Sequence, residues 1–211
     1  MEELLAILAQ ARDNGSSLKI VGGSCPVCHG SEDIVVSLQH MDRLLGLDTA
    51  ARTVTVEPGM TLSALATILA SINLGVDVAG RVPDLAVTDA LAIGGPGLGC
   101  GGAGLGSSVV SLQVVQLTAG GGEVVSWSWD THPRQLGGVM GGLGMVAVPV
   151  SVTLQARPLA LVQEVSYLTS VKEVVDTWHM VTGHRTSDHQ QLTWFPFTEL
   201  VIITHTSAVD K

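Results

Sequence analysis

A glycine-rich stretch in the middle of the chain reads Ile93-Gly-Gly-Pro-Gly-Leu-Gly-Cys-Gly-Gly-Ala-Gly-Leu-Gly-Ser-Ser108. Eight of the thirteen residues from Gly94 to Gly106 are glycine. No regular helix or strand tolerates that density, because glycine loses the most backbone entropy on ordering. Flexible linkers combine glycine with polar residues, whereas Leu98, Ala103 and Leu105 interrupt this stretch. Its bare N–H groups would suit phosphate, so the pattern favours a buried anion or cofactor loop over a plain connector.

The composition is that of a folded α/β protein. The chain has 211 residues, of which 46% are hydrophobic and 3% aromatic, enough to bury the core of one large or two small domains. No run approaches the ~18 uninterrupted apolar residues of a membrane span. A net charge of −9 without a basic patch excludes nucleic acid and anionic membrane surfaces as expected partners. No targeting segment is visible, so the sequence itself assigns no compartment.

Helix and strand patterns alternate ahead of the glycine-rich stretch. Apolar residues at helical spacing, followed by Gly15, predict a helix over Glu2 to Asn14. Thr61 can cap a second helix, whose apolar stripe is formed by Leu62, Leu65, Ile68, Leu69 and Ile72. Short apolar or alternating runs predict strands over residues 18–21, 34–38 and 53–57, with a turn over 41–45.

A hairpin and a second glycine cluster follow the stretch. Residues 112–118 and 123–127 are typical of two strands joined at Gly120-Gly121-Gly122. Residues 130–134 are expected to form a solvated turn. The second cluster, from Gly137 to Gly144, leads into a strand over Val150 to Gln155.

The pattern changes at Arg157-Pro158, which we interpret as a domain boundary. Ser170 and Glu173 have capping-box spacing and predict a helix to Trp178, and residues 192–204 predict a strand pair around Pro196-Phe197. About fifty residues remain after the boundary, too few for an independent core without a partner.

The order of these motifs resembles the FAD-binding domains of the vanillyl-alcohol oxidase superfamily, the PCMH type. The resemblance rests on Gly22-Gly-Ser-Cys-Pro26, Leu44-Leu-Gly-Leu-Asp48, Thr53-Val-Thr-Val-Glu-Pro-Gly59, the glycine-rich stretch, Gly141-Gly-Leu-Gly144 and Val152-Thr-Leu-Gln155. Within that superfamily the chain is most similar to the aldonolactone oxidoreductases, which include L-gulonolactone oxidase and L-galactono-1,4-lactone dehydrogenase. Residues 194–204 resemble the start of their substrate (cap) domain.

The resemblance implies an α+β fold. Residues 1–157 would form a PCMH-type FAD-binding domain of two α/β subdomains, about 1–57 and 58–157, and residues 158–211 part of the cap domain. FAD would lie between the subdomains with its pyrophosphate on the two glycine loops. The positions implied to bind it are Gly22, Gly23, Ser24, Cys25, Pro26, Gly94, Gly95, Gly99, Cys100, Gly101, Gly102, Gly104, Gly144, Met145 and Val146.

Several features distinguish the chain from these enzymes. Cys25 stands where some relatives carry the histidine that tethers the flavin, so a noncovalent FAD is expected. Residues Gly101 to Gly104 lack the polar side chains that bond the cofactor in relatives, which leaves its retention open. The acid/base residues of these enzymes lie further downstream than Lys211, so no catalytic residue is carried over.

Two functions follow from the resemblance. Such enzymes pass a hydride from a sugar lactone to the flavin and electrons onward to oxygen or cytochrome c, giving ascorbate or an analogue. The chain would be either half of a split enzyme completed by a second polypeptide, or a non-catalytic subunit of a larger assembly. The partial cap, the lost polar contacts and the apolar composition favour the second. Because the plant-type dehydrogenases are mitochondrial and tied to the respiratory chain, a mitochondrial complex is the expected location.

The three cysteines allow other interpretations. Cys25-Pro-Val-Cys28-His29 matches the pattern for c-type haem attachment, and Cys25, Cys28, His29 and Cys100 could hold zinc. Uneven cysteine spacing gives no disulfide framework and favours either a reducing compartment or a metal or redox role. We favour small buried thiols in tight turns and predict no metal site. Surface positions are expected for His132, His179, His184, His189 and His205.

Overall fold

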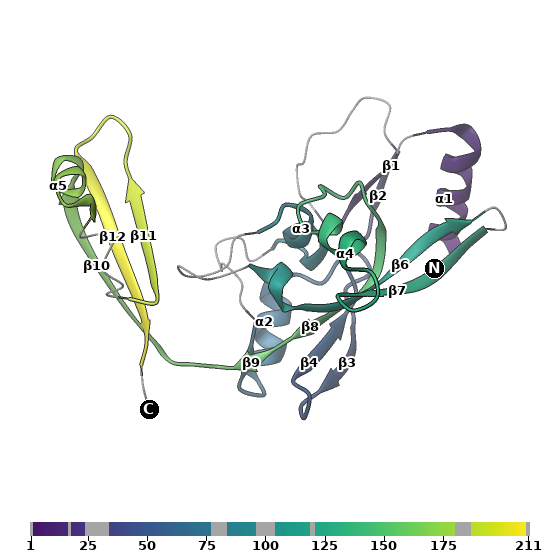
Figure 1. The fold of residues 1–211 in the computed structure, drawn as a ribbon, viewed down its shortest axis with the longest axis horizontal. Helices are drawn as coiled ribbons and strands as arrows, with labels where there is room; N and C mark the ends of the chain where they lie inside the picture. The colour runs from purple at the N-terminus through teal and green to yellow at the C-terminus, as the bar shows by residue number, and fades with distance from the viewer. Residues whose placement is uncertain are drawn as a thin grey trace. The chain divides into compact units, whose positions relative to one another are not determined.

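The computed structural model describes residues 2–16, 18–23, 34–76, 84–95, 104–118, 121–179 and 187–209. They form two compact units, one extending to Pro158 and the other beginning at Leu159 (Figure 1). Mixed helices and strands in both units agree with the predicted α+β class. No helix in the described part of the chain is long and apolar enough to cross a bilayer.

A five-stranded antiparallel sheet forms the centre of the first unit. Its order is β3-β4-β8-β6-β7, where the strands are β3 (Leu44–Asp48), β4 (Thr53–Val56), β6 (Val109–Thr118), β7 (Gly121–Ser128) and β8 (Val148–Gln155). The predicted hairpin is confirmed, because β6 and β7 pair antiparallel up to Thr118 and Gly121. Strands β3 and β4, which the resemblance assigned to the first subdomain, lie in this sheet because β4 pairs with β8.

Helices α2 (Leu62–Ala70), α3 (Val87–Ala92) and α4 (Pro133–Val139) share a core with the sheet. Thr61 caps α2 as predicted, since its hydroxyl accepts the N–H of Ala64. Apolar side chains from all these helices meet strand residues such as Val54, Val114 and Val152, each fully buried. This core fixes α3, the helix that enters the glycine-rich stretch.

A second core packs around other residues of the same sheet. Helix α1 (Glu2–Asn14) has the predicted bounds, and β1 (Leu18–Val21) pairs parallel with β2 (Ile34–Ser37). Leu8 of α1 and Ile20 of β1 pack with Val115 of β6 and Val150 of β8. The sheet therefore stands between α1 with the β1–β2 pair and the core that contains α2, α3 and α4.

Several short elements differ from the prediction. Leu44 and Leu45 begin strand β3 rather than belonging to a turn, and α4 begins at Pro133 inside the segment expected to be a solvated turn. Arg157 and Pro158 form β9, which pairs with β5 (Leu74–Gly75). The glycine-rich stretch ends in a 3₁₀ turn, η1 (Leu105–Ser108).

The second unit is a three-stranded antiparallel sheet with one helix. The strands β10 (Val162–Ser170), β11 (His189–Trp194) and β12 (Leu200–Ala208) have the order β10-β12-β11. The predicted strand pair corresponds to β11 and β12, whereas β10 was not predicted. Ser170 caps α5 (Val171–Asp176), accepting the Glu173 N–H at 3.1 Å.

An ion pair between Arg43 and Glu57 fastens the start of β3 to the end of β4. The Glu57 carboxylate is buried and accepts the backbone N–H of Arg43 at 2.9 Å and its guanidinium at 2.7 and 3.1 Å. The hydrogen bonds from the Arg43 side chain lower the pKa of Glu57 below its usual value.

We expect Glu57→Gln to lower the free energy of unfolding by about 1 kcal/mol at pH 7. Because the folded-state pKa of Glu57 is lowered, its stabilisation is complete above the unfolded-state pKa and disappears as pH falls through the folded-state pKa. Urea unfolding at pH 7 and at pH 3 should therefore show a wild-type advantage that shrinks in acid. Glu123→Gln, at an exposed carboxylate of β7, is the control, and an equal loss at both pH values would contradict the pairing.

Candidate cofactor site

The end of β1 lies directly against α3. A Cβ placed on Gly22 would come within 2.8 Å of the Ala86 Cβ and 3.2 Å of the Thr88 Cβ. Close approach of two backbones is a common reason for glycine at such a position. The first glycine pair of the predicted phosphate loop is thus held on the helix that leads into the second loop.

The second glycine cluster contacts the same strand. Gly144 has φ +75°, and a Cβ on it would overlap the carbonyl oxygen of Ile20 in β1. The N–H groups of Gly141 and Leu143 donate to the carbonyls of Leu91 (2.8 Å) and Ala92 (2.9 Å) at the end of α3. These bonds bring the three glycine segments of the sequence to one place.

The structure describes eight of the fifteen predicted site residues. It brings Gly22, Gly23, Gly94 and Gly144 together, since Gly23 adjoins α3 and a Cβ on Gly94 would contact the Gly141 Cα at 3.5 Å. Gly95 donates to the carbonyl of Ala90, and Gly104, with φ +68°, precedes η1. The predicted positions Ser24, Cys25, Pro26, Gly99, Cys100, Gly101 and Gly102 lie outside the described residues.

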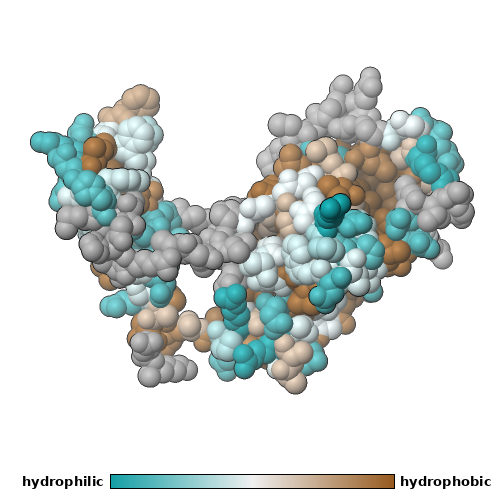
Figure 2. All heavy atoms as spheres, viewed as in Figure 1, coloured by the Kyte–Doolittle hydropathy of each residue, from teal (hydrophilic) through white to brown (hydrophobic). Residues whose placement is uncertain are grey.

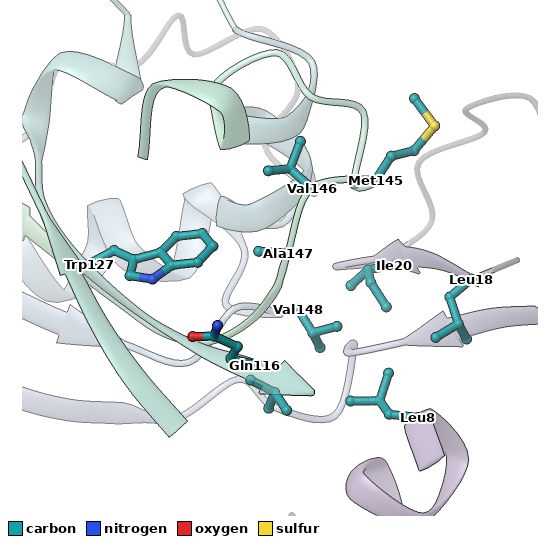
Figure 3. A pocket seen from close by; sticks show the side chains of 11 residues that line it. Leu8, Leu18, Ile20, Gln116, Trp127, Met145, Val146, Ala147 and Val148 are labelled. Carbon is teal, nitrogen blue, oxygen red and sulfur yellow. The ribbon is translucent and has the colours of Figure 1, made fainter. Parts of the chain in front are cut away.

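A pocket of about 380 Å³ opens beside this junction (Figure 3). Its walls come from α1, β1, the β6–β7 hairpin and the segment after Gly144. The lining residues are Leu8, Leu18, Ile20, Val115, Gln116, Trp127, Gly144, Met145, Val146, Ala147 and Val148. None of these described residues carries a charge, so this lining suits an apolar group and supplies no acid or base. The predicted residues Met145 and Val146 line it, whereas the sequence did not indicate Trp127 or Ile20.

Two polar residues of α3 face the junction and were missed in the sequence. Asp89 is 3% exposed, and its carboxylate accepts the N–H of Gly22 at 2.6 Å. The hydroxyl of Thr88 is buried and finds no hydrogen-bond partner within the described residues. Thr88 also lines a smaller cavity with Ile20, Gly142 and Gly144. The sequence did contain a signal for Asp89, because it is the one charged residue in the largely apolar run from Leu85 to Ile93.

The described residues contain no group of three or more His, Cys, Asp or Glu side chains able to hold a metal ion. Cys25, Cys28, His29 and Cys100, which carried the haem and zinc alternatives, lie outside the described ranges. Of the histidines, His132 stacks on Trp127 and His205 stacks on Tyr167. His132, His189 and His205 are partly exposed and His179 is exposed, in agreement with the surface positions expected, and His184 lies outside the described residues.

Comparison with known proteins identifies the family. The family model described as FAD binding domain matches residues 1–128. The chain belongs to this FAD-binding family. L-gulonolactone oxidase from Bos taurus is 29% identical over 219 residues, covering 100% of this chain and 47% of the relative. L-galactono-1,4-lactone dehydrogenase, mitochondrial, from Brassica oleracea is 22% identical over 213 residues, covering 100% and 35%.

Solved structures agree on the fold of the family. A structure of solvent-stable cholesterol oxidase superposes with a TM-score of 0.82 at 22% identity, covering 99% of this chain and 44% of the other. The predicted resemblance to the aldonolactone oxidoreductases and the predicted PCMH-type fold are therefore confirmed. The chain spans about half the length of the curated relatives it matches.

FAD is the cofactor of this family. The described residues suit an apolar part of it but not its pyrophosphate. The uncharged pocket beside Gly144 offers space for an apolar group, and the Thr88 hydroxyl, which has no hydrogen-bond partner among the described residues, could bond a ligand. At the first glycine loop, however, the Gly22 N–H is already bound to a buried carboxylate. A pyrophosphate needs that kind of donor free and without a neighbouring negative charge.

Proposed function

We propose that this chain is a non-catalytic subunit of a larger assembly, built on the FAD-binding fold of the aldonolactone oxidoreductases. The observation that carries the proposal is the exposed apolar surface of the second unit. In that unit the core of buried apolar side chains, within the described residues, consists of Val174, Val201 and Ile203. Large apolar side chains are instead exposed, namely Leu159, Leu161, Val162, Leu168, Trp178, Trp194 and Phe197.

An exposed apolar surface of this kind is normally covered by other polypeptide. Leu168 and Trp194 lie on the two edge strands of the sheet and are 62% and 58% exposed. Exposed apolar patches of this kind mark contacts with other polypeptide, and a core as small as that of Val174, Val201 and Ile203 contributes little stability by itself. Figure 2 shows apolar atoms (brown) at the surface among polar ones. Further polypeptide over the β10-β12-β11 sheet would complete the core.

The location of the assembly is proposed by analogy. The Brassica oleracea relative is named as mitochondrial. The resemblance to the plant-type dehydrogenases led to the same expectation of a mitochondrial location. We therefore propose a mitochondrial assembly, with the respiratory chain as the expected setting.

A split enzyme is the second candidate. The uncharged pocket beside Gly144 and the 29% identity to L-gulonolactone oxidase favour it. In that case a second polypeptide would supply both the rest of the cap domain and the acid/base residues of an FAD-dependent aldonolactone oxidoreductase.

Measurements on native material that contains the chain distinguish the non-catalytic subunit from the split enzyme. Its absorbance in the flavin bands is measured first, followed by cytochrome c reduction with L-gulono-1,4-lactone or L-galactono-1,4-lactone. We expect no lactone-dependent turnover, and backbone amides of β10, β11 and β12 that exchange slowly in the assembly and fast in the isolated chain. Bound flavin with turnover would establish the split enzyme. Slow exchange in the isolated chain would overturn the need for a partner.

A further inference from the structure

The carboxylate of Asp89 binds the first backbone N–H of the predicted phosphate loop. Asp89 lies in α3, all six residues of which are buried. Its carboxylate oxygen accepts the backbone N–H of Gly22 at 2.6 Å across 67 residues of sequence. This is a short, charge-assisted hydrogen bond in a site from which water is excluded. It is the same bond that a bound phosphate oxygen would make with a glycine-loop N–H.

The surrounding packing leaves the carboxylate little room to move away. The Cβ position of Gly22 lies 2.8 Å from the Ala86 Cβ and 3.3 Å from the Asp89 Cγ. Helix α3 is itself held at its C-terminal end by the Gly141 and Leu143 N–H groups, which donate to the carbonyls of Leu91 and Ala92. A ligand could gain the Gly22 N–H only by displacing α3 from β1 or by neutralising the carboxylate.

The negative charge extends to the next residue of the loop. The Cβ position of Gly23 lies 3.6 Å from the second carboxylate oxygen of Asp89. A pyrophosphate placed on Gly22 and Gly23 would therefore bring its own charge to within a few ångströms of a buried carboxylate, where repulsion is screened far less than in water.

We propose that Asp89 acts as an internal substitute for the cofactor phosphate: its carboxylate holds the Gly22 N–H in place of a phosphate oxygen and competes with the FAD pyrophosphate for that donor. Phosphate exclusion at Gly22 does not depend on the partner subunits proposed above, and binding measurements test it separately.

The test is a titration of the full chain with FAD and with riboflavin, which lacks the pyrophosphate. Asp89→Asn keeps the size of the side chain and an oxygen for the Gly22 N–H but removes the charge. We expect it to tighten FAD binding about tenfold or more, with riboflavin binding unchanged. Asp84→Asn, the same substitution at an exposed carboxylate five residues earlier, should change neither. Unchanged or weaker FAD binding in Asp89→Asn would overturn the proposal.

The wild-type chain gives a second measurement that needs no variant. ADP and adenosine differ in the phosphates and share the base and ribose. We expect calorimetry to show that ADP binds no more tightly than adenosine, or that neither binds. If ADP binds more than about tenfold tighter, the loop captures phosphate despite Asp89 and the proposal fails, even where Asp89→Asn does not fold.

Discussion

Gly144→Ala is expected to lower the free energy of unfolding by about 3 kcal/mol, through two separate penalties. The first is backbone strain, because Gly144 has φ +75°, a conformation that costs a residue with a Cβ about 1 kcal/mol. The second is overlap, because the new methyl group would meet the carbonyl oxygen of Ile20 in β1. Relieving that overlap requires the backbone after the second glycine cluster to move away from β1, and overpacking of this kind costs about 2 kcal/mol.

Gly141→Ala provides the matched control. Gly141 also has positive φ, at +84°, yet apart from its chain neighbours no heavy atom of the described residues lies within 4 Å of its Cβ position. It should therefore show the strain without the overlap, a loss of about 1 kcal/mol. Urea unfolding of both variants measures the difference. Equal losses would mean that β1 and the glycine cluster are not in close contact, and the three-way junction described above would be wrong.

Leu8→Ala is expected to cost about 3 kcal/mol. Leu8 is fully buried in α1 and packs with Ile20, Val36 and Val115, so truncation removes transfer free energy and leaves a cavity. Because Leu8 also lines the pocket beside Gly144, the cavity would merge with it. Urea unfolding gives the loss, and a dye that binds apolar cavities should bind the variant more tightly than the wild type.

The neighbouring leucine on the same helix tests the specificity of this effect. Leu5 is half-buried at the edge of the same core, so Leu5→Ala should cost about 1 kcal/mol and leave dye binding unchanged. A larger loss for Leu5 than for Leu8 would show that α1 presents a different face to the sheet.

The sequence correctly predicted those helices and strands whose own residues carry a clear pattern, such as an apolar stripe, a cap or a glycine turn. Helix α1 follows from its apolar spacing and Gly15, α2 from its stripe and the Thr61 cap, and the β6–β7 hairpin from its triple glycine. Helix α3 was missed because all six of its residues are buried, and a helix buried on every side shows no amphipathic period. Strand β3 was missed because a bulge between Leu44 and Gly46 interrupts its alternation.

The candidate site, too, could be predicted from the sequence only in part. The roles of the glycines at residues 22, 94 and 144 could be predicted, because a positive φ and a close approach of two backbones both favour glycine. The role of Asp89 could not, since it depends on a contact with Gly22 that only the folded chain creates. Likewise, the pairing of β4 with β8, about a hundred residues later, leaves no mark in the sequence of either strand.

The place of β8 in the sheet has a consequence for synthesis on the ribosome. This strand lies between β4 and β6 and hydrogen-bonds to both, yet it is the last of the five to emerge. Until residues 148–155 leave the exit tunnel, β3–β4 and β6–β7 are two separate hairpins, and isolated hairpins are marginally stable at best. Until then β4 and β6 would each lack the neighbour that joins them in the sheet, a period in which chaperone binding would prevent aggregation.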